Sequence, residues 1–238
     1  MIYNILKLDL NNGEVISVVG GGGKTTTIFQ LAKELKSLNK KVLITTTTAI
    51  YNPDEKEYDC FFLEDIKDFQ PTDGTITIFG QKIVGEKLIG VSLEKLDEII
   101  EKRVFDFILI EADGAKKKPI KAPETYEPVI TKNTTKTIGV IGLDSLGRAI
   151  NEENVHRPEI FTKITNTSLL DIIKADIIVK LVLHEEGLFK SSKGEKILLL
   201  NKANDHDLIK EGMKIRESLL NRGMKNVVIS DIQRKMFY

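Results

Sequence analysis

The sequence predicts an α/β protein with a mostly parallel sheet and helices on both of its faces. Two observations support this class. Short apolar runs rich in β-branched residues alternate with amphipathic helical patterns from one end of the chain to the other. No repeat, low-complexity stretch or Pro/Ser-rich linker interrupts the 238 residues. Residues 1–238 are therefore expected to form one domain, which is long enough to bury a core of its own.

The apolar runs place the expected strands, because each is four to eight residues long and ends in polar or turn-forming residues. These strands are expected at 14–19, 41–46, 75–80, 105–111, 136–143, 176–183, 196–201 and 226–230. Helices are expected at 25–38, where apolar residues recur at helical spacing, and from Ser92, a good N-cap, to Arg103. A third helix is expected at 205–221, and 116–136 is the main irregular segment.

Charge and cysteine content exclude several classes of protein. The 35 basic residues balance 35 acidic ones, so the chain lacks the net positive charge typical of nucleic-acid and membrane-surface binders. No apolar run approaches the roughly 20 residues of a membrane helix, and the N-terminus lacks a signal-peptide pattern. Cys60 is the only cysteine and is expected to be a buried thiol within the run CFFL. A cytoplasmic protein without a nucleic-acid or membrane partner is expected.

The strongest motif is EVISVVGGGGKTTT at 14–27, where an expected strand leads through four glycines and Lys24 into an expected helix. Glycines let backbone amides close around phosphate oxygens, the helix N-terminus adds partial positive charge, and the lysine reaches the outer phosphates. Gly20, Gly21, Gly22, Gly23, Lys24, Thr25 and Thr26 are therefore the predicted phosphate-binding residues. The motif is the short form GxxGKT, which resembles the P-loop of the Mur ligases. A dinucleotide GxGxxG motif is disfavoured, because Thr25 occupies the third glycine position.

A second motif, FDFILIEADG at 105–114, ends an apolar strand in Glu111 and Asp113 and turns at Gly114. Beside a phosphate loop, such carboxylates hold Mg²⁺, and the glycine amide can contact the terminal phosphate. Thr25, Glu111 and Asp113 are the predicted metal site, and Lys24, Glu111 and Asp113 the predicted catalytic residues. The basic run that follows, which includes Lys121, is expected either to meet phosphates or an acidic substrate or to be a solvated surface.

Base recognition is predicted at Asn201 and Lys202, just beyond the expected strand 196–201. The segment is similar to the NKxD element with which GTPases recognise guanine. Asn204 stands at the fourth position and Asp205 follows it, so both GTP and ATP stay open as the nucleotide. Thr45–Thr48 could supply a further hydroxyl at the same edge of the sheet, or simply be good strand formers.

The chain resembles the YqeC family across nearly its whole length. The segments that carry the resemblance are ISVVGGGGKTT, LITTTT, LIEADGAKKKPIKAP, the EP pair at 127–128, VHRPE, the GLFK run and LLNKAN. That resemblance implies a cytoplasmic P-loop protein that assists maturation of a selenium-dependent molybdenum hydroxylase, with the hydroxylase or its cofactor as partner. It supports Gly20–Thr25, Glu111, Asp113 and Lys121 as the core of the site.

The sequence thus favours a P-loop domain that binds and hydrolyses ATP or GTP with Mg²⁺. Two alternatives stay open. One is an ATP-dependent ligase or kinase acting on a small acidic substrate that lies against Lys116–Lys121. The other is a nucleotide-gated binding module with little turnover.

Overall fold

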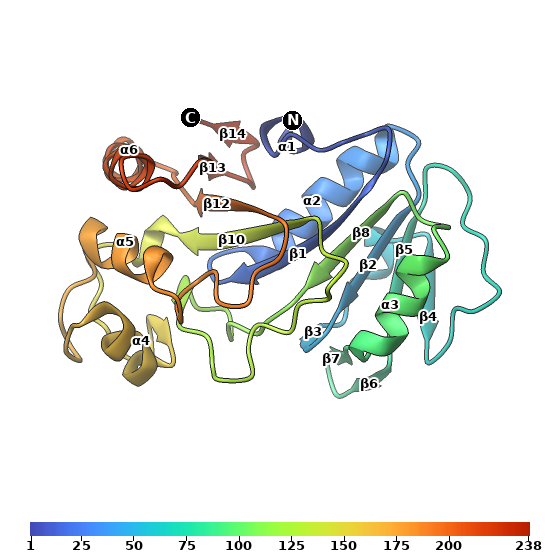
Figure 1. Ribbon diagram of the computed structural model, residues 1–238, viewed down its shortest axis with the longest axis horizontal. Helices are drawn as coiled ribbons and strands as arrows, with labels where there is room; N and C mark the ends of the chain where they lie inside the picture. Colours follow the sequence, from blue (N-terminus) through green and yellow to red (C-terminus); the bar gives the residue numbers. More distant parts are fainter.

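The computed structural model describes residues 1–238 and has the expected α/β architecture (Figure 1). Six α-helices and two short 3₁₀ helices are present: α1 (Ile2–Ile5), α2 (Lys24–Ser37), η1 (Glu55–Glu57), α3 (Leu93–Glu101), η2 (Leu143–Ser145), α4 (Pro158–Thr165), α5 (Ala175–Leu183) and α6 (His206–Leu220). The strands are β1 (Glu14–Gly20), β2 (Val42–Thr46), β3 (Ala49–Tyr51), β4 (Cys60–Leu63), β5 (Ile76–Gly80), β6 (Lys82–Val84), β7 (Lys87–Ile89), β8 (Phe107–Glu111), β9 (Ile120–Lys121), β10 (Lys136–Gly142), β11 (Val155–His156), β12 (Glu195–Asn201), β13 (Val227–Asp231) and β14 (Met236–Phe237).

Nine strands form the main sheet in the order β14-β13-β12-β10-β1-β8-β2-β5-β4. All neighbours in it are parallel except β13 and β14. Small additional sheets, β3-β7-β6 and β11-β9, lie apart from it. Apart from β14, the strands of the main sheet all run in the same direction. The carboxyl ends of the parallel strands therefore share one edge of the sheet.

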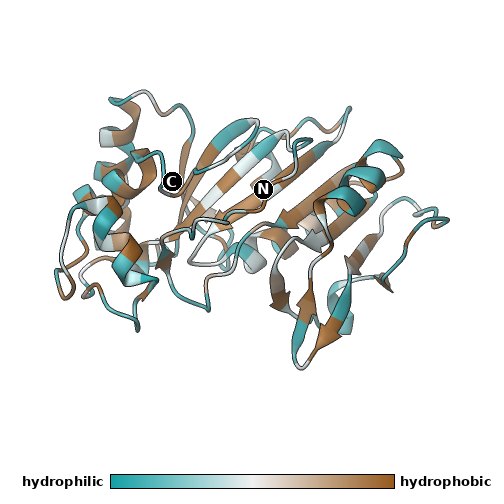
Figure 2. Ribbon diagram, turned by 60° about the horizontal axis from the view of Figure 1, so that its bottom comes forward, coloured by the Kyte–Doolittle hydropathy of each residue, from teal (hydrophilic) through white to brown (hydrophobic).

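Two apolar cores lie on opposite faces of the sheet. One contains residues of α1 and α2, such as Ile2, Ile28 and Leu35. The other packs α3, α4, α5 and α6 against the opposite face. The central strands β1, β8 and β10 are buried at nearly every position, which explains why they read as continuous apolar runs. In Figure 2 these strands are largely brown, whereas the helices carry teal on their outer sides.

The prediction of a strand at 176–183 is wrong, because this segment forms helix α5. Asp176, Lys180 and Leu183 are exposed while Ile177, Ile178, Leu181 and Val182 are buried, which is a helical spacing. The run has only two charged residues, so its apolar character hides that spacing, and a short apolar run does not distinguish a strand from a buried helix. The expected strands at 14–19, 41–46, 75–80, 105–111, 136–143, 196–201 and 226–230 are confirmed within a few residues.

Two smaller expectations are also corrected. Cys60 is partly exposed rather than buried, because it begins β4, which forms one edge of the main sheet. The irregular segment 116–136 contains the short strand β9, which pairs with β11. The three expected helices are present, and Ser92 and Asp205 cap α3 and α6 by accepting hydrogen bonds from Lys95 N and Leu208 N. No helix is long and apolar enough to cross a membrane.

Candidate functional site

The glycine-rich turn lies at the centre of the carboxyl edge of the sheet. It follows β1, whose neighbours are β8 on one side and β10 on the other. Gly20 pairs with Val140 of β10, and Val18 pairs with Glu111 at the end of β8. Chain connections leave β1 and β8 toward opposite sides of the sheet here, and ligands of open α/β sheets bind at such a reversal.

The glycines make the turn possible because other backbone segments press against it. Gly20, Gly22 and Gly23 have φ angles of 95°, 78° and 123°, which side chains disfavour. A Cβ on Gly22 would lie 2.1 Å from Gly142 N. The amides of Gly20, Gly21 and Gly22 already donate to Asp113 Oδ2, Val140 O and Lys118 O.

The amides that are free to bind an anion belong to the residues that follow Gly22 in the chain. Gly23 N makes no hydrogen bond, and the first-turn amides Lys24–Thr26 have no side-chain cap at the start of α2. These four amides point out of a helix N-terminus, which favours negative charge. The part of the turn with amides available to an anion is therefore Gly23–Thr26, which is the second half of the predicted phosphate-binding segment.

Lys24 occupies the middle of the site and is only 4% exposed. Its Nζ donates to Gly20 O at 2.7 Å and lies 3.0 Å from Asp113 Oδ1 and 3.6 Å from Glu111 Oε1. Burial alone would lower the pKa of Lys24, but the charges of Asp113 and Glu111 more than offset this and raise it. The ammonium therefore stays charged inside the site.

Glu111 and Asp113 fit the metal role that the sequence predicts. Thr25 Oγ1 donates a hydrogen bond to Glu111 Oε2 at 2.7 Å, so the hydroxyl oxygen and a carboxylate oxygen lie side by side. Asp113 Oδ1 is buried and, despite its ion pair, accepts no hydrogen bond, which leaves lone pairs for a ligand. No group of three His, Cys, Asp or Glu residues could hold a metal by itself. This set suits Mg²⁺, which takes one or two carboxylates and completes its shell with water and phosphate oxygens.

The two carboxylates differ in their electrostatic setting. Burial raises the pKa of Glu111, and the Lys24 ammonium and the Thr25 hydroxyl counter this only in part. Asp113 has in addition the Gly20 amide and the ammonium of Lys121, at 3.0 and 3.1 Å from Oδ2. A buried carboxylate with a raised pKa beside a buried lysine is typical of functional sites.

Lys121 is not placed to meet a ligand directly, since it is 2% exposed and surrounded by acceptors. Its Nζ donates to Gly114 O at 2.7 Å and to Glu127 Oε2 at 2.5 Å. Arg157 in turn donates from Nη1 and Nη2 to Glu127 at 2.6 and 3.1 Å. Lys121 therefore positions Asp113 and the turn at Gly114.

Glu111, Lys24, Asp113, Lys121, Glu127 and Arg157 form a chain of alternating charges, which we call the ion chain. Burial opposes ionisation of Glu127, but Arg157 and Lys121 bring its pKa down to about 2. The pKa of Arg157 is raised, because Glu127 outweighs the effect of burial. The ion chain thus connects the glycine turn with β9 and the start of α4.

The residues predicted to recognise the base, Asn201 and Lys202, both make hydrogen bonds within the protein. Asn201 Nδ2 donates to Gly22 O at 2.9 Å and its Oδ1 accepts from Ile232 N at 3.1 Å, so it joins the phosphate loop to the end of β13. Lys202 donates to Asp144 Oδ2 at 2.9 Å. Asp205 Oδ1 is occupied by its cap of α6.

Further polar residues and Gly114 surround this edge. The hydroxyls of Thr45, Thr46 and Thr47 donate to the carbonyl oxygens of Phe79, Glu111 and Val129, so they hold loops in place. A Cβ on Gly114 would meet nothing within 4 Å, which leaves room for a ligand beside Asp113. His156 is partly exposed, and burial, Arg157, Lys121 and Lys116 lower its pKa to about 4.

Sequence reasoning missed two site residues, Asp144 and Glu127. Asp144 follows β10 beside the glycine turn; it binds Lys202, and its Oδ1 is buried without a hydrogen bond. Its position two residues after the end of β10 at Gly142 could have indicated a site residue. Glu127 was seen only as part of an EP pair, and the Glu127–Pro128 peptide bond is cis.

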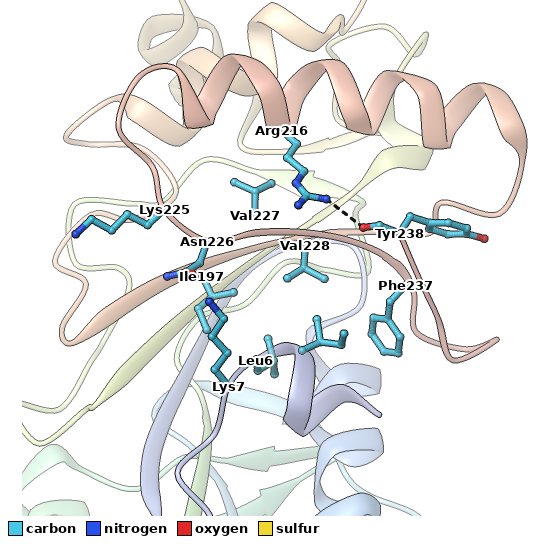
Figure 3. A pocket seen from close by; sticks show the side chains of 11 residues that line it. Leu6, Lys7, Ile197, Arg216, Lys225, Asn226, Val227, Val228, Phe237 and Tyr238 are labelled. Atoms are coloured by element: carbon cyan, nitrogen blue, oxygen red, sulfur yellow. Dashed lines mark hydrogen bonds between the residues drawn. The ribbon is translucent and has the colours of Figure 1, made fainter.

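A separate hollow of about 300 Å³ lies far from this edge (Figure 3). Ile197 and Val227, near the amino ends of β12 and β13, line it together with Leu6 and Phe237. Figure 3 shows Arg216 reaching from α6 to the carbonyl of Tyr238, at 3.3 Å. Because it adjoins the opposite ends of the strands, this hollow is not part of the site at the glycine turn.

The fold and the edge cluster define a mostly parallel α/β protein with a short glycine-lysine turn at the switch point of its sheet. The chain belongs to the YqeC family, since the family model described as "YqeC protein" matches residues 16–159. A relative in Escherichia coli (strain K12), named "Uncharacterized protein YqeC", is 37% identical over 181 residues. The match covers 74% of this chain and 70% of that relative. The family match contains the glycine turn and all six residues of the ion chain.

Proposed function

We propose that this protein binds a magnesium nucleoside triphosphate at the Gly23–Thr26 amides and hydrolyses it. The observation that carries the proposal is the buried Lys24 ammonium, held between Glu111 and Asp113 directly beside those amides. A polyphosphate needs amides, a cation and a metal-holding carboxylate at one point. All three lie together at the end of β1.

Stability alone is a poor reason for this arrangement. Removing a lysine and two carboxylates from water costs several kcal/mol per ion, and well-packed apolar residues are often as stable or more so. Apart from the ion pair with Lys24, Asp113 Oδ1 has no hydrogen-bond partner, and the amides of Gly23–Thr26 have no side-chain cap. An anionic ligand with a divalent cation would satisfy both.

Each residue then has a defined part. Lys24 would exchange its carboxylate partners for the outer phosphates, and Thr25 with Glu111 or Asp113 would hold Mg²⁺. When bound, Mg²⁺ neutralises charge on the phosphates and on the carboxylates that Lys24 has left. Asp113 Oδ1 would accept a hydrogen bond from the attacking water and orient it toward the terminal phosphate. The water oxygen bonds to the terminal phosphorus as the bond to the bridging oxygen breaks, so the nucleoside diphosphate leaves and the water proton goes to the released phosphate. Lys121 and the Gly20 amide keep Asp113 in position.

A second candidate is a ligase or kinase that uses the nucleotide on a small acidic substrate. Lys87 and Lys117 lie 3.6 and 4.1 Å from the centre of the Tyr51 ring and make no ion pair with a carboxylate. Lys117 belongs to the loop that follows Asp113, so these cations are available to an acidic substrate near the phosphate end. Phosphate release that requires such an acid, with a phosphorylated or ligated product, distinguishes this candidate from hydrolysis.

Maturation of a selenium-dependent molybdenum hydroxylase stays a prediction from the family resemblance. In that role the hydroxylase or its cofactor would change the rate of nucleotide turnover. Adding a purified hydroxylase to a phosphate-release assay tests it, and an unchanged rate would count against the partnership.

Calorimetric titration with Mg·ATP and Mg·GTP tests the proposed site. We expect binding to the wild type and none to Lys24→Ala, with Lys210→Ala on the exposed side of α6 as the control. Thr25→Val removes the hydroxyl with little change in volume and should weaken the Mg²⁺-dependent part of binding. Circular dichroism verifies that each variant is folded. Undiminished affinity in folded Lys24→Ala would overturn the site.

A further inference from the structure

A cleft of about 310 Å³ begins where the phosphate loop ends, and we call it the α2 cleft. Thr25 and Thr26 form one end, and Phe29 and Gln30 continue it along the same face of α2. Ile232 and Gln233, in the turn after β13, form the facing wall. Under the proposed function the phosphates lie on the amides of Gly23–Thr26, so the nucleoside leaves the loop beside Thr25 and Thr26.

The walls of the α2 cleft combine apolar surface with free amide groups. Phe29 and Ile232 are 5% and 1% exposed, so they form a packed base to the cleft. The Gln233 side chain makes no hydrogen bond, and Gln30 makes only a long one, at 3.5 Å to Glu34. Small-molecule sites typically pair apolar walls with a few polar groups that fix orientation.

The polar groups favour adenine over guanine. Recognition of guanine by an NKxD element needs a free carboxylate, but Asp205 is occupied as the cap of α6 and Asn201 is bonded at both ends. Glu57 and Lys33, which also line the cleft, form an ion pair with each other at 3.6 Å. A carboxamide, in contrast, makes two hydrogen bonds with the N6 and N7 edge of adenine.

We infer that the α2 cleft binds the nucleoside of ATP and that Gln30 and Gln233 recognise its adenine. The inference rests on the proposed function, because the phosphate loop fixes where the nucleoside begins. Asn201 is a positioning residue in this arrangement: it bonds both Gly22 O and Ile232 N, so the phosphate loop and the facing wall keep a constant separation.

Calorimetry with Mg·ATP, Mg·GTP and Mg·tripolyphosphate, which has no base, tests the inference. ATP should bind at least about tenfold more tightly than GTP, because a carboxamide that pairs with adenine leaves polar groups unpaired against guanine. The double variant Gln30→Ala/Gln233→Ala should weaken ATP about tenfold, from the loss of two hydrogen bonds, and leave tripolyphosphate unchanged. Gln81→Ala, a glutamine outside the cleft, is the matched control.

The outcomes separate this inference from the proposed function. Tripolyphosphate binding in the wild type, together with equal affinities for ATP and GTP or a double variant that binds ATP normally, would overturn the adenine site alone. A wild-type protein that binds neither tripolyphosphate nor a nucleotide would overturn both. Weaker ATP binding in the double variant with unchanged tripolyphosphate binding would support both.

Discussion

Replacing Lys121 with methionine removes the charge that links the two halves of the ion chain, with little change in side-chain length. The ammonium contacts Gly114 O, Asp113 and Glu127 at 2.7, 3.1 and 2.5 Å. Breaking a buried ionic group by removing one partner costs about 3–5 kcal/mol. Arg157 still pairs with Glu127, and the Gly20 amide still pairs with Asp113. We therefore expect the free energy of unfolding to fall by the lower end of this range, about 3 kcal/mol.

Urea unfolding at neutral pH measures this loss, and thermal unfolding should show a midpoint lower by roughly 6–12 °C for a domain of this size. Lys117→Met is the matched control from the same loop. Its ammonium lies over Tyr51 and makes no buried ion pair, so it should cost less than about 1 kcal/mol. A Lys121→Met protein that is as stable as the wild type but binds nucleotide poorly would refute the positioning role. It would indicate instead that Lys121 contacts the ligand directly.

Three further predictions concern the site and its surroundings. Chelating Mg²⁺ should abolish ATP binding in calorimetry, because Glu111 and Asp113 would face the phosphates uncompensated; full affinity in EDTA would contradict the metal site. Stability should fall as the pH drops from 6.5 toward 4, because the pKa of His156 is lowered to about 4 and only the unfolded chain binds its proton in that window. His156→Gln should flatten that part of a urea-midpoint profile, and an unchanged slope would argue against it. Gly22→Ala should lower the free energy of unfolding by more than about 1 kcal/mol, since its Cβ would lie 2.1 Å from Gly142 N, whereas Gly114→Ala has free space. Equal stability of these two variants in urea would refute the close packing of the turn.

Much of the fold could be predicted because its central strands are buried on both faces and therefore apolar throughout. The rule that parallel strands end at one edge also predicted that the Gly20–Thr26 turn and the end of β8 meet, and Val18 does pair with Glu111. Helix α5 was not predicted, because it is also apolar over most of its length. Its buried face is so wide that the run resembles a central strand.

The rest of the site depends on contacts between residues far apart in the chain. Nothing local to Lys121 signals that Asp113 and Glu127 surround it, so a lysine in a basic run reads as a ligand group. Asp144 and Lys202 are 58 residues apart, so no local pattern in the sequence predicts the ion pair between them. Glu111, Lys24 and Thr25 were easier, because two motifs at strand ends contain all three.

A structure determined with Mg²⁺ and a non-hydrolysable ATP analogue tests the central claim most directly. The proposal predicts the outer phosphates on the amides of Gly23–Thr26, with Lys24 Nζ moved from Asp113 to a phosphate oxygen. It also predicts Mg²⁺ between the phosphates, Thr25 and a carboxylate of Glu111 or Asp113. An analogue bound elsewhere, such as in the hollow of Figure 3, with Lys24 still paired to Asp113, would contradict it.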